Sequence, residues 1–164
     1  DLPLSPSLLL SFANQSVHEA ANGKIMMTFF VGIADFEQKT LTYASAGHNP
    51  PWLYRSRPEG GFKSESLVSK GPRLGESLYV PSYDERVVSL NNQDLLVLYT
   101  DGLLEDKNEE GAQYGKKRAR KVIESHLAGG PKSVTTQLVR DFMAFNGSKP
   151  LDDDLTLAVV KFSV

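Results

Sequence analysis

The chain has 164 residues, of which 40% are hydrophobic and 23% charged, with no cysteine and a formal net charge of −2 at pH 7. This composition is typical of one soluble globular domain over residues 1–164, and it excludes wholesale disorder, a collagen-like repeat and a highly charged nucleic-acid-binding tail. The lack of cysteine excludes disulfides, thiolate zinc sites and cysteine nucleophiles, and it predicts a reducing, cytoplasmic location.

The chain begins at Asp1 rather than at methionine, so either a segment has been removed or the sequence is a piece of a larger gene product. The apolar cluster Leu8–Leu10 is too short for the core of a signal peptide and has no basic segment before it. No apolar run approaches the ~20 residues that span a bilayer, so no membrane contact is expected. Ser5-Pro6 and Asn22-Gly23 instead predict the two ends of a helix.

A β-rich half is expected to follow this helix. Ile25–Asp35 and Leu41–Ala46 read as the two strands of a hairpin, and Trp52–Tyr54 as a short third strand. Residues 56–82 are rich in glycine, proline and serine, and they predict a long surface excursion within the same domain.

The second half is expected to contain two more strands, two helices and a final strand. Hydrophobic periodicity and the turn residues Asn91-Asn92 define these elements. In chain order they are a paired hairpin of Arg86–Leu90 and Leu95–Thr100, helices over Gly115–Leu127 and Ser133–Phe145, and a strand over Leu155–Phe162. The sequence therefore predicts an α+β fold with a sheet built from hairpins.

Acidic residues stand at the ends of two predicted strands. Asp101-Gly102 follows the first of these strands directly, and Asp152-Asp153-Asp154 comes just before the final strand. If the two strands are antiparallel neighbours, several carboxylates meet at one edge of the sheet, where their mutual repulsion calls for a cation. Ligands that are all oxygen favour Mg²⁺ or Mn²⁺ over zinc. The alternative is also open, because Asp-Gly is a common turn and an acidic triplet is often a solvated loop.

Several segments resemble the motifs of one enzyme family. Tyr99–Glu105 is similar to the T-D-G-(x)-x-E motif, and Asp153–Thr156 to the D-D/N-x-T motif, of bacterial metal-dependent protein phosphatases of type 2C (PP2C). Within that family the chain resembles the branch of stage II sporulation protein E and the sigma-factor regulators. Two further segments match family motifs: Tyr43–Pro51 resembles A-G-H-x-P-P, and Asn91–Leu96 resembles G-D-x-L with asparagine and glutamine in place of the glycine. Shorter matches are Leu74-Gly75 before the central strands, and Gly111 and Tyr114-Gly115 after the T-D-G motif. The resemblance runs from about Ser5 to the C-terminus.

This resemblance implies a fold, a reaction and a set of site residues. The fold is a layered α-β-β-α sandwich of mainly antiparallel sheets, and the reaction is hydrolysis of phosphoserine or phosphothreonine by a metal-activated water, with two Mn²⁺ or Mg²⁺ ions in the complete domain. By motif position, Asp101 and Asp153 correspond to metal ligands, and Gly102 to the tight turn that points Asp101 at the metals. Asp154 and Thr156 correspond to residues that support the loop.

One motif of the family is missing from this chain. The first metal motif, G-D-V-x-G-H-G, precedes the region where the chain starts, so the resemblance implies a domain truncated at its N-terminus. Gly47-His48 is similar to the end of that motif but lacks the aspartate before it. We therefore expect this fragment to be inactive, or nearly so, by itself. The alternative is a pseudophosphatase, a signalling module that binds a regulatory protein without turnover.

The resemblance also implies the kind of partner. In this branch the substrate is a phosphorylated regulatory protein such as an anti-sigma-factor antagonist, and sensor or receiver domains lie upstream. An exposed sheet edge left by truncation favours a homodimer. No nucleic-acid partner is expected, because the one basic run, Lys116–Lys121, spreads around a helix and is typical of a solvated face. The histidines His18, His48 and His126 show no metal-binding spacing.

Overall fold

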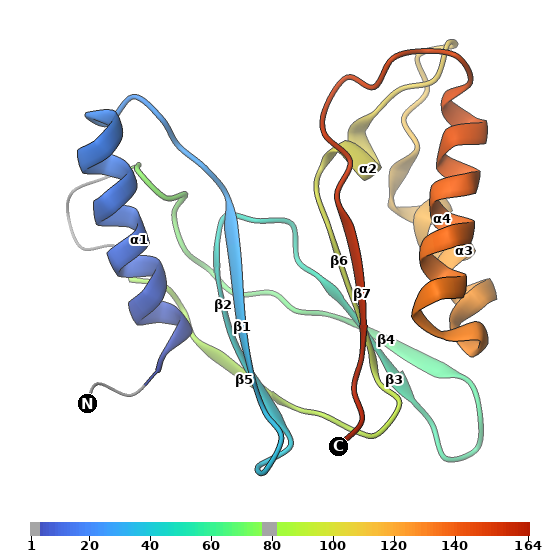
Figure 1. Ribbon diagram of the computed structural model, residues 1–164, viewed down its shortest axis with the longest axis horizontal. Coiled ribbons are helices and arrows are strands. Elements are labelled where there is room, and N and C mark those ends of the chain that lie inside the picture. The colour runs from blue at the N-terminus through green and yellow to red at the C-terminus, as the bar shows by residue number, and fades with distance from the viewer. Residues whose placement is uncertain (1–3, 77–81) are drawn as a thin grey trace. The chain divides into compact units, whose positions relative to one another are not determined.

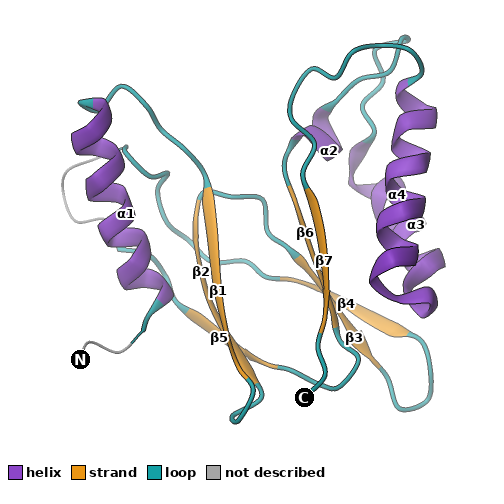
Figure 2. Ribbon diagram, viewed as in Figure 1, coloured by secondary structure: helices purple, strands orange, loops and turns teal. Residues whose placement is uncertain are grey.

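A computed structural model describes residues 4–76 and 82–164 of the chain (Figure 1). The chain divides into two compact units, each with its own sheet and helices (Figure 2). The first unit comes from the described parts of Asp1–Pro50 and Leu67–Leu90, with Val164, and the second from Pro51–Ser66 and Asn91–Ser163. The fold class is α+β with antiparallel sheets, as the sequence predicts.

The first unit is a three-stranded antiparallel sheet with one helix. Its strands are β1 (Phe29–Asp35), β2 (Thr40–Ala46) and β5 (Arg86–Ser89), in the order β1-β2-β5. Helix α1 (Pro6–Ala21) contacts β2 and buries Leu10 completely. The predicted ends of this helix are confirmed, because the Ser5 hydroxyl accepts a hydrogen bond from Leu8 N (3.3 Å) and Asn22 caps the helix in the left-handed conformation. The predicted β1–β2 hairpin is confirmed too.

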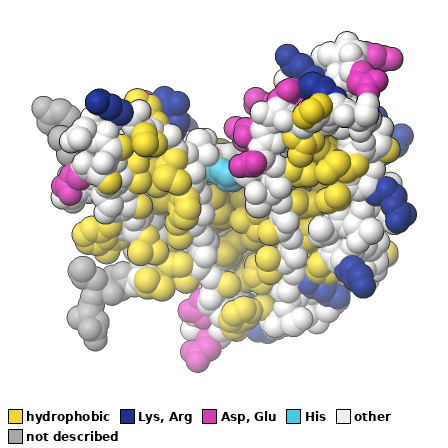
Figure 3. Space-filling view, turned by 45° about the horizontal axis from the view of Figure 1, so that its top comes forward, with side chains coloured by type: hydrophobic (Ala, Val, Ile, Leu, Met, Phe, Trp, Pro, Cys, Tyr) yellow, Lys and Arg dark blue, Asp and Glu magenta, His cyan; other side chains and the backbone are white. Residues whose placement is uncertain are grey.

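Hydrophobic side chains are exposed over parts of this first unit, and Figure 3 shows them beside its helix. The most exposed of these in the helix is Phe12, at 55%, and Leu9 one turn earlier is 40% exposed. A run of further side chains, Ile25, Met26, Met27 and Phe29, is 42–61% exposed. Exposed apolar surface of this kind is typical of a contact surface.

The second unit is a four-stranded antiparallel sheet in the order β4-β3-β6-β7, with helices on it. The strands are β3 (Trp52–Ser56), β4 (Phe62–Ser66), β6 (Leu95–Tyr99) and β7 (Leu157–Lys161). The helices are α2 (Gly102–Glu105), α3 (Gly115–His126), the single 3₁₀ turn Leu127–Gly129 and α4 (Gly130–Asn146). The core joins apolar side chains of β3 and β6 to those of α3 and α4; it includes Trp52, Val97, Tyr99, Ile123, Leu138 and Phe142.

The predicted pairing of Arg86–Leu90 with Leu95–Thr100 is wrong. The first of these strands, β5, pairs with β2, and the second, β6, pairs with β3 and β7. The reason is Asp94, which is fully buried rather than exposed in a turn. Its carboxylate accepts hydrogen bonds from Ser56 N (3.0 Å) and Asn91 N (2.9 Å) and lies 3.5 Å from the Arg55 guanidinium, so it fastens the start of β6 to β3.

The long excursion predicted over residues 56–82 contains a strand that the sequence does not reveal. Strand β4 pairs with β3 along its whole length, from Trp52 opposite Ser66 to Ser56 opposite Phe62. It carries a single large apolar residue, Phe62, which packs on the core, so period-2 patterning is absent. Residues 77–81 of the same excursion lie outside the described residues. Smaller differences are that β1 begins at Phe29 rather than Ile25, and that α4 begins at Gly130 rather than Ser133.

The helices in the described residues are too short or too polar to cross a membrane.

The prediction of one domain over residues 1–164 stays a prediction.

Candidate functional site

The two acidic segments singled out in the sequence lie at the same edge of the second unit's sheet. Strands β6 and β7 are antiparallel neighbours, and Tyr99 at the end of β6 stands opposite Leu157 at the start of β7. Asp101 follows β6 and Asp153 precedes β7, so the pairing brings two segments 52 positions apart into one place. The predicted antiparallel neighbourhood of the two strands is therefore confirmed.

Thr100 holds the two segments together. Its backbone N donates to Thr156 O (3.1 Å), and its hydroxyl donates to Asp154 O (2.9 Å) while accepting from Thr156 N (2.9 Å). The hydrogen bonds thus continue the β6–β7 pairing beyond the last regular pair and fix the backbone that directly follows Asp153. Thr100 is not among the site residues predicted from the sequence. Its position directly before Asp101 in the T-D-G motif could have indicated this structural role.

Gly102 is required by close packing of the same two segments. A Cβ atom at this position would lie 2.6 Å from the carbonyl oxygen of Asp154 and 3.5 Å from that of Asp153. Gly102 is also buried, and it begins the short helix α2. The reason for glycine here is therefore the approach of the 152–154 backbone, in addition to the turn that the motif implies.

The predicted site residues line a small acidic cavity. Its volume is about 260 Å³. Five carboxylate side chains and one lysine reach it; the lining residues are Asp101, Gly102, Glu105, Asp106, Lys107, Gln113, Asp152 and Asp153. Of the predicted supporting residues, Gly102 lines the cavity, whereas Asp154 and Thr156 lie behind it in the hydrogen bonds to Thr100.

Two of the five carboxylates form ion pairs with Lys149. Its Nζ lies 2.6 Å from Asp152 Oδ2 and 3.7 Å from Asp106 Oδ1, and it also donates to Lys107 O (3.1 Å). The hydrogen bond from Lys149 lowers the pKa of the Asp152 carboxyl, and the same hydrogen bond raises the pKa of Lys149. Asp152, which has no counterpart in the family motif, is therefore part of an ion pair.

Asp106 lines the cavity and links two of its loops. Only 3% of this residue is exposed, and its Oδ1 accepts hydrogen bonds from Lys107 N (2.9 Å) and Asp152 N (3.4 Å). Its Oδ2 atom is buried and has no hydrogen-bond partner among the described residues. The acid thus ties the loop after α2 to the loop before β7, and one of its oxygens is left without a donor.

The two predicted metal ligands, Asp101 and Asp153, keep most of their oxygens open. The Asp101 carboxylate makes no hydrogen bond or ion pair within residues 4–76 and 82–164, and Asp153 accepts one hydrogen bond, from Asp154 N to Oδ1 (2.7 Å). These oxygens suit a hard cation such as Mg²⁺ or Mn²⁺. The described residues nevertheless contain no group of three His, Asp or Glu side chains placed to hold a metal ion. The donor chemistry therefore fits the implied metal, but two carboxylates cannot enclose it.

The three histidines make local contacts. His48 Nδ1 lies 3.2 Å from the Thr28 hydroxyl, and its backbone N donates to the Ser45 hydroxyl (3.1 Å), so the A-G-H-x-P-P segment forms a fixed turn in the first unit. His18 Nδ1 lies 3.0 Å from Gly75 O, and His126 Nδ1 lies 2.8 Å from Val122 O.

Comparison with known proteins places this geometry in a family. The family model described as "Stage II sporulation protein E (SpoIIE)" matches residues 1–163. The phosphoserine phosphatase RsbU of Bacillus subtilis (strain 168) is 27% identical over 163 residues, which are 98% of this chain and 46% of RsbU. The chain spans less than half of the length of the curated relatives it matches.

Two solved structures show the same fold at lower identity. The SiaA-PP2C domain of Pseudomonas aeruginosa superposes with a TM-score of 0.77 at 21% identity, over 97% of this chain and 60% of that one. The manganese-presoaked phosphatase domain of the cell fate determinant SpoIIE from Bacillus subtilis gives 0.54 at 17% identity, over 83% and 56%. The matched residues include both acidic segments of the cavity, at the ends of β6 and β7. The chain therefore belongs to the stage II sporulation protein E (SpoIIE) family, whose phosphatase domains have the PP2C fold.

Proposed function

We propose that this chain is part of a PP2C-type protein serine/threonine phosphatase domain that hydrolyses phosphoserine or phosphothreonine on a regulatory protein. The observation that carries the proposal is the pair Asp101 and Asp153. Two segments far apart in the sequence are fastened side by side, and each presents a carboxylate with open oxygens to the same acidic cavity. Membership of the SpoIIE family supports the same reaction.

The residues around the cavity divide into ligands and supports. Asp101 and Asp153 would hold Mn²⁺ or Mg²⁺, while Thr100 and Gly102 keep the two segments in contact. Lys149 forms ion pairs with Asp152 and Asp106, so we assign those two acids to holding the loops rather than the cation. A bound divalent cation would supply Lewis acidity toward the phosphoryl group and lower the pKa of water. The remaining positions around it belong to water or to groups other than those described.

The proposed substrate follows from the relatives. RsbU is named a phosphoserine phosphatase. We extend this to a cytoplasmic, phosphorylated signalling protein, such as an anti-sigma-factor antagonist, as the substrate of the whole protein to which this chain belongs. Electrostatics support a metal-dependent reaction in particular, because the five carboxylates of the cavity outnumber the two nearby lysines, Lys107 and Lys149, and the excess negative charge repels a phosphate group unless a metal cation is bound.

The test is hydrolysis of p-nitrophenyl phosphate and of a phosphoserine peptide, with and without Mn²⁺. We expect a longer protein that contains this chain to turn over both substrates, and Asp101→Asn to lower the rate at least about a hundredfold. The chain of 164 residues alone is expected to be inactive, because two carboxylates bind the cation weakly.

Each result has a separate meaning. Robust turnover by the 164-residue chain alone would contradict the idea that its two carboxylates are insufficient. A longer protein that binds the phosphorylated partner with Mn²⁺ present but never hydrolyses it would favour the pseudophosphatase alternative. Equal rates for the wild type and Asp101→Asn would overturn the assignment of the site.

A further inference from the structure

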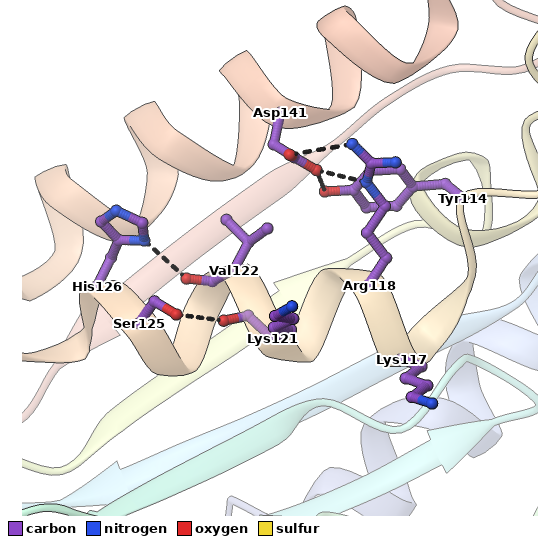
Figure 4. Close-up of a pocket in the computed structure, with 8 residues that line it drawn as sticks. All are labelled: Tyr114, Lys117, Arg118, Lys121, Val122, Ser125, His126 and Asp141. Carbon is purple, nitrogen blue, oxygen red and sulfur yellow. Dashed lines mark hydrogen bonds and ion pairs between the residues drawn. The ribbon is translucent and has the colours of Figure 1, made fainter.

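A second hollow lies in the second unit, between helices α3 and α4 (Figure 4). Its volume is about 590 Å³, and a neighbouring hollow of about 280 Å³ continues it along the same two helices, with Val122, His126 and Asp141 shared by both. The α3 side of the groove presents a stripe of residues one turn apart: Lys117, Lys121 and Ser125. The cavity that holds Asp101 and Asp153 is lined by different residues.

The wall of this groove is fixed by a compact set of interactions. Arg118 makes two hydrogen bonds to the Asp141 carboxylate, at 2.7 and 3.1 Å, and Tyr114 donates a third to the same acid at 2.7 Å (Figure 4). The Arg118 guanidinium also lies over the ring of Phe145, 4.8 Å from its centre. Asp141 is thereby neutralised by Arg118, and these hydrogen bonds link α3 to α4.

The positive charges that remain have no ion-pair partner among the residues that the structure describes. Lys117 and Lys121 on α3, and Arg140 on α4, form no ion pair within the described ranges 4–76 and 82–164. Once Arg118 and Asp141 cancel, the groove carries three uncompensated cations. The chain as a whole has a net charge of −2, so this groove is a local reversal of its overall charge.

We propose that the α3–α4 groove docks an acidic, amphipathic helical segment of a protein partner. An apolar face would pack on Val122 and Ala144 between the helices, and carboxylates one turn apart would meet Lys117 and Lys121. Helix α3 has 12 residues, or ~18 Å, which matches three turns of a docked helix. The apolar contacts that Val122 and Ala144 offer favour such a segment over nucleic acid, whose binding sites rely on many cations along a backbone.

This surface requires no phosphatase activity, so its test is binding. Peptides of about 15 residues, long enough for a helix, are selected from a random displayed library on the immobilised chain. We expect the selected peptides to be acidic and amphipathic. Their affinity for the chain, measured by fluorescence anisotropy, is expected to fall about tenfold in Lys117→Glu/Lys121→Glu and to weaken as salt screens the ion pairs.

The matched control is Lys63→Glu/Lys161→Glu, which makes the same change of net charge at exposed lysines of β4 and β7. It should leave the affinity within about twofold. The neutral variant Lys117→Gln/Lys121→Gln should also weaken peptide binding while its thermal unfolding stays unchanged. This result attributes the lost affinity to the lost charge and not to unfolding of the chain. The proposal is overturned if no peptide is enriched, if the selected peptides are neutral or basic, if both double variants weaken binding equally, or if single-stranded nucleic acid binds the groove more tightly than the peptides do.

Discussion

Replacement of Gly102 by alanine tests whether the close approach of two loops builds the acidic cavity. The new Cβ atom would lie 2.6 Å from the carbonyl oxygen of Asp154, which is nearer than a carbon and a backbone oxygen can approach. Neither neighbour is the flexible end of a side chain, so the backbone of the 152–154 segment has to move. That movement would also stretch the hydrogen bonds from Thr100 to Asp154 and Thr156.

The magnitude follows from two opposing terms. Forcing extra volume into a packed site costs about 1–3 kcal/mol. Alanine restricts the unfolded chain more than glycine and returns about 0.4–1 kcal/mol. The net destabilisation of Gly102→Ala is therefore about 1–2 kcal/mol, which lowers the midpoint of thermal unfolding by about 2–8 °C in a chain of this size.

The assay is thermal unfolding followed by circular dichroism, with Gly32→Ala as the matched control. Gly32 lies within strand β1, where a Cβ would meet side-chain atoms alone, the nearest being Leu41 Cδ1 at 3.2 Å and Phe30 Cε1 at 3.5 Å, and no backbone atom within 4 Å is among its three nearest neighbours. The control should change the midpoint by less than half as much as Gly102→Ala. The reasoning is refuted if Gly102→Ala is as stable as the wild type, or if both alanine variants lose the same stability.

Three further predictions concern hydrogen bonds and ion pairs of the second unit. Thr100→Val should lower the free energy of unfolding in urea by about 1–3 kcal/mol, because the Asp154 carbonyl and the Thr156 N–H lose their hydrogen-bond partner. Thr100→Ser keeps the hydroxyl and should retain most of the stability. Equal losses in the two variants would contradict this role. Lys149→Gln should raise the pKa of Asp152 back toward its ordinary value of 3.8, as followed by NMR titration, and an unchanged titration would argue against the ion pair. The hydrogen bonds from Arg118 hold the pKa of the Asp141 carboxyl below its ordinary value of 3.8. The ionised carboxylate therefore stabilises the fold above pH 3.8, and this stabilisation is lost as the pH falls through the lower pKa of the folded state. The difference in unfolding free energy between wild type and Asp141→Asn should therefore shrink in acid, and a difference that grows below pH 3.8 would refute the assignment.

A homodimer is the one predicted assembly that hydrodynamics can examine directly. The exposed apolar side chains of the first unit, including Phe12 and Phe29, offer a contact surface. Sedimentation velocity over a wide range of concentration is expected to show a dimer that dissociates on dilution. A single monomeric species at all concentrations would rule it out.

The sequence predicted best those elements that patterns of a few residues define. The caps of α1 are local, so Ser5 and Asn22 were sufficient to place both its ends. The two carboxylates were found because each stands at the end of an apolar strand, and a strand's end is visible in the sequence. Their actual proximity depended on the pairing of β6 with β7, which the sequence could state only as a condition.

What the sequence could not supply depends on partners that lie far along the chain. Asp94 looks like an ordinary turn residue, and only the backbone N–H of Ser56 and the guanidinium of Arg55 explain why it is buried and why β5 and β6 enter different sheets. Lys149 likewise has no motif of its own, and its link to Asp106 arises 43 positions away. Strand β4 was missed because backbone pairing with β3, rather than apolar alternation, defines it.

The position of β7 in the chain also sets the order in which the acidic cavity can form. Asp101 is synthesised well before Asp153, but the segment that carries Asp153 is held in place by β7, which comes last of the strands in the described residues. Closure of this long loop is slow compared with the folding of local hairpins and helices. A nascent chain that has not yet released residues 157–161 therefore exposes Asp101 without its counterpart, so the cavity is completed only after β7 has emerged and paired with β6.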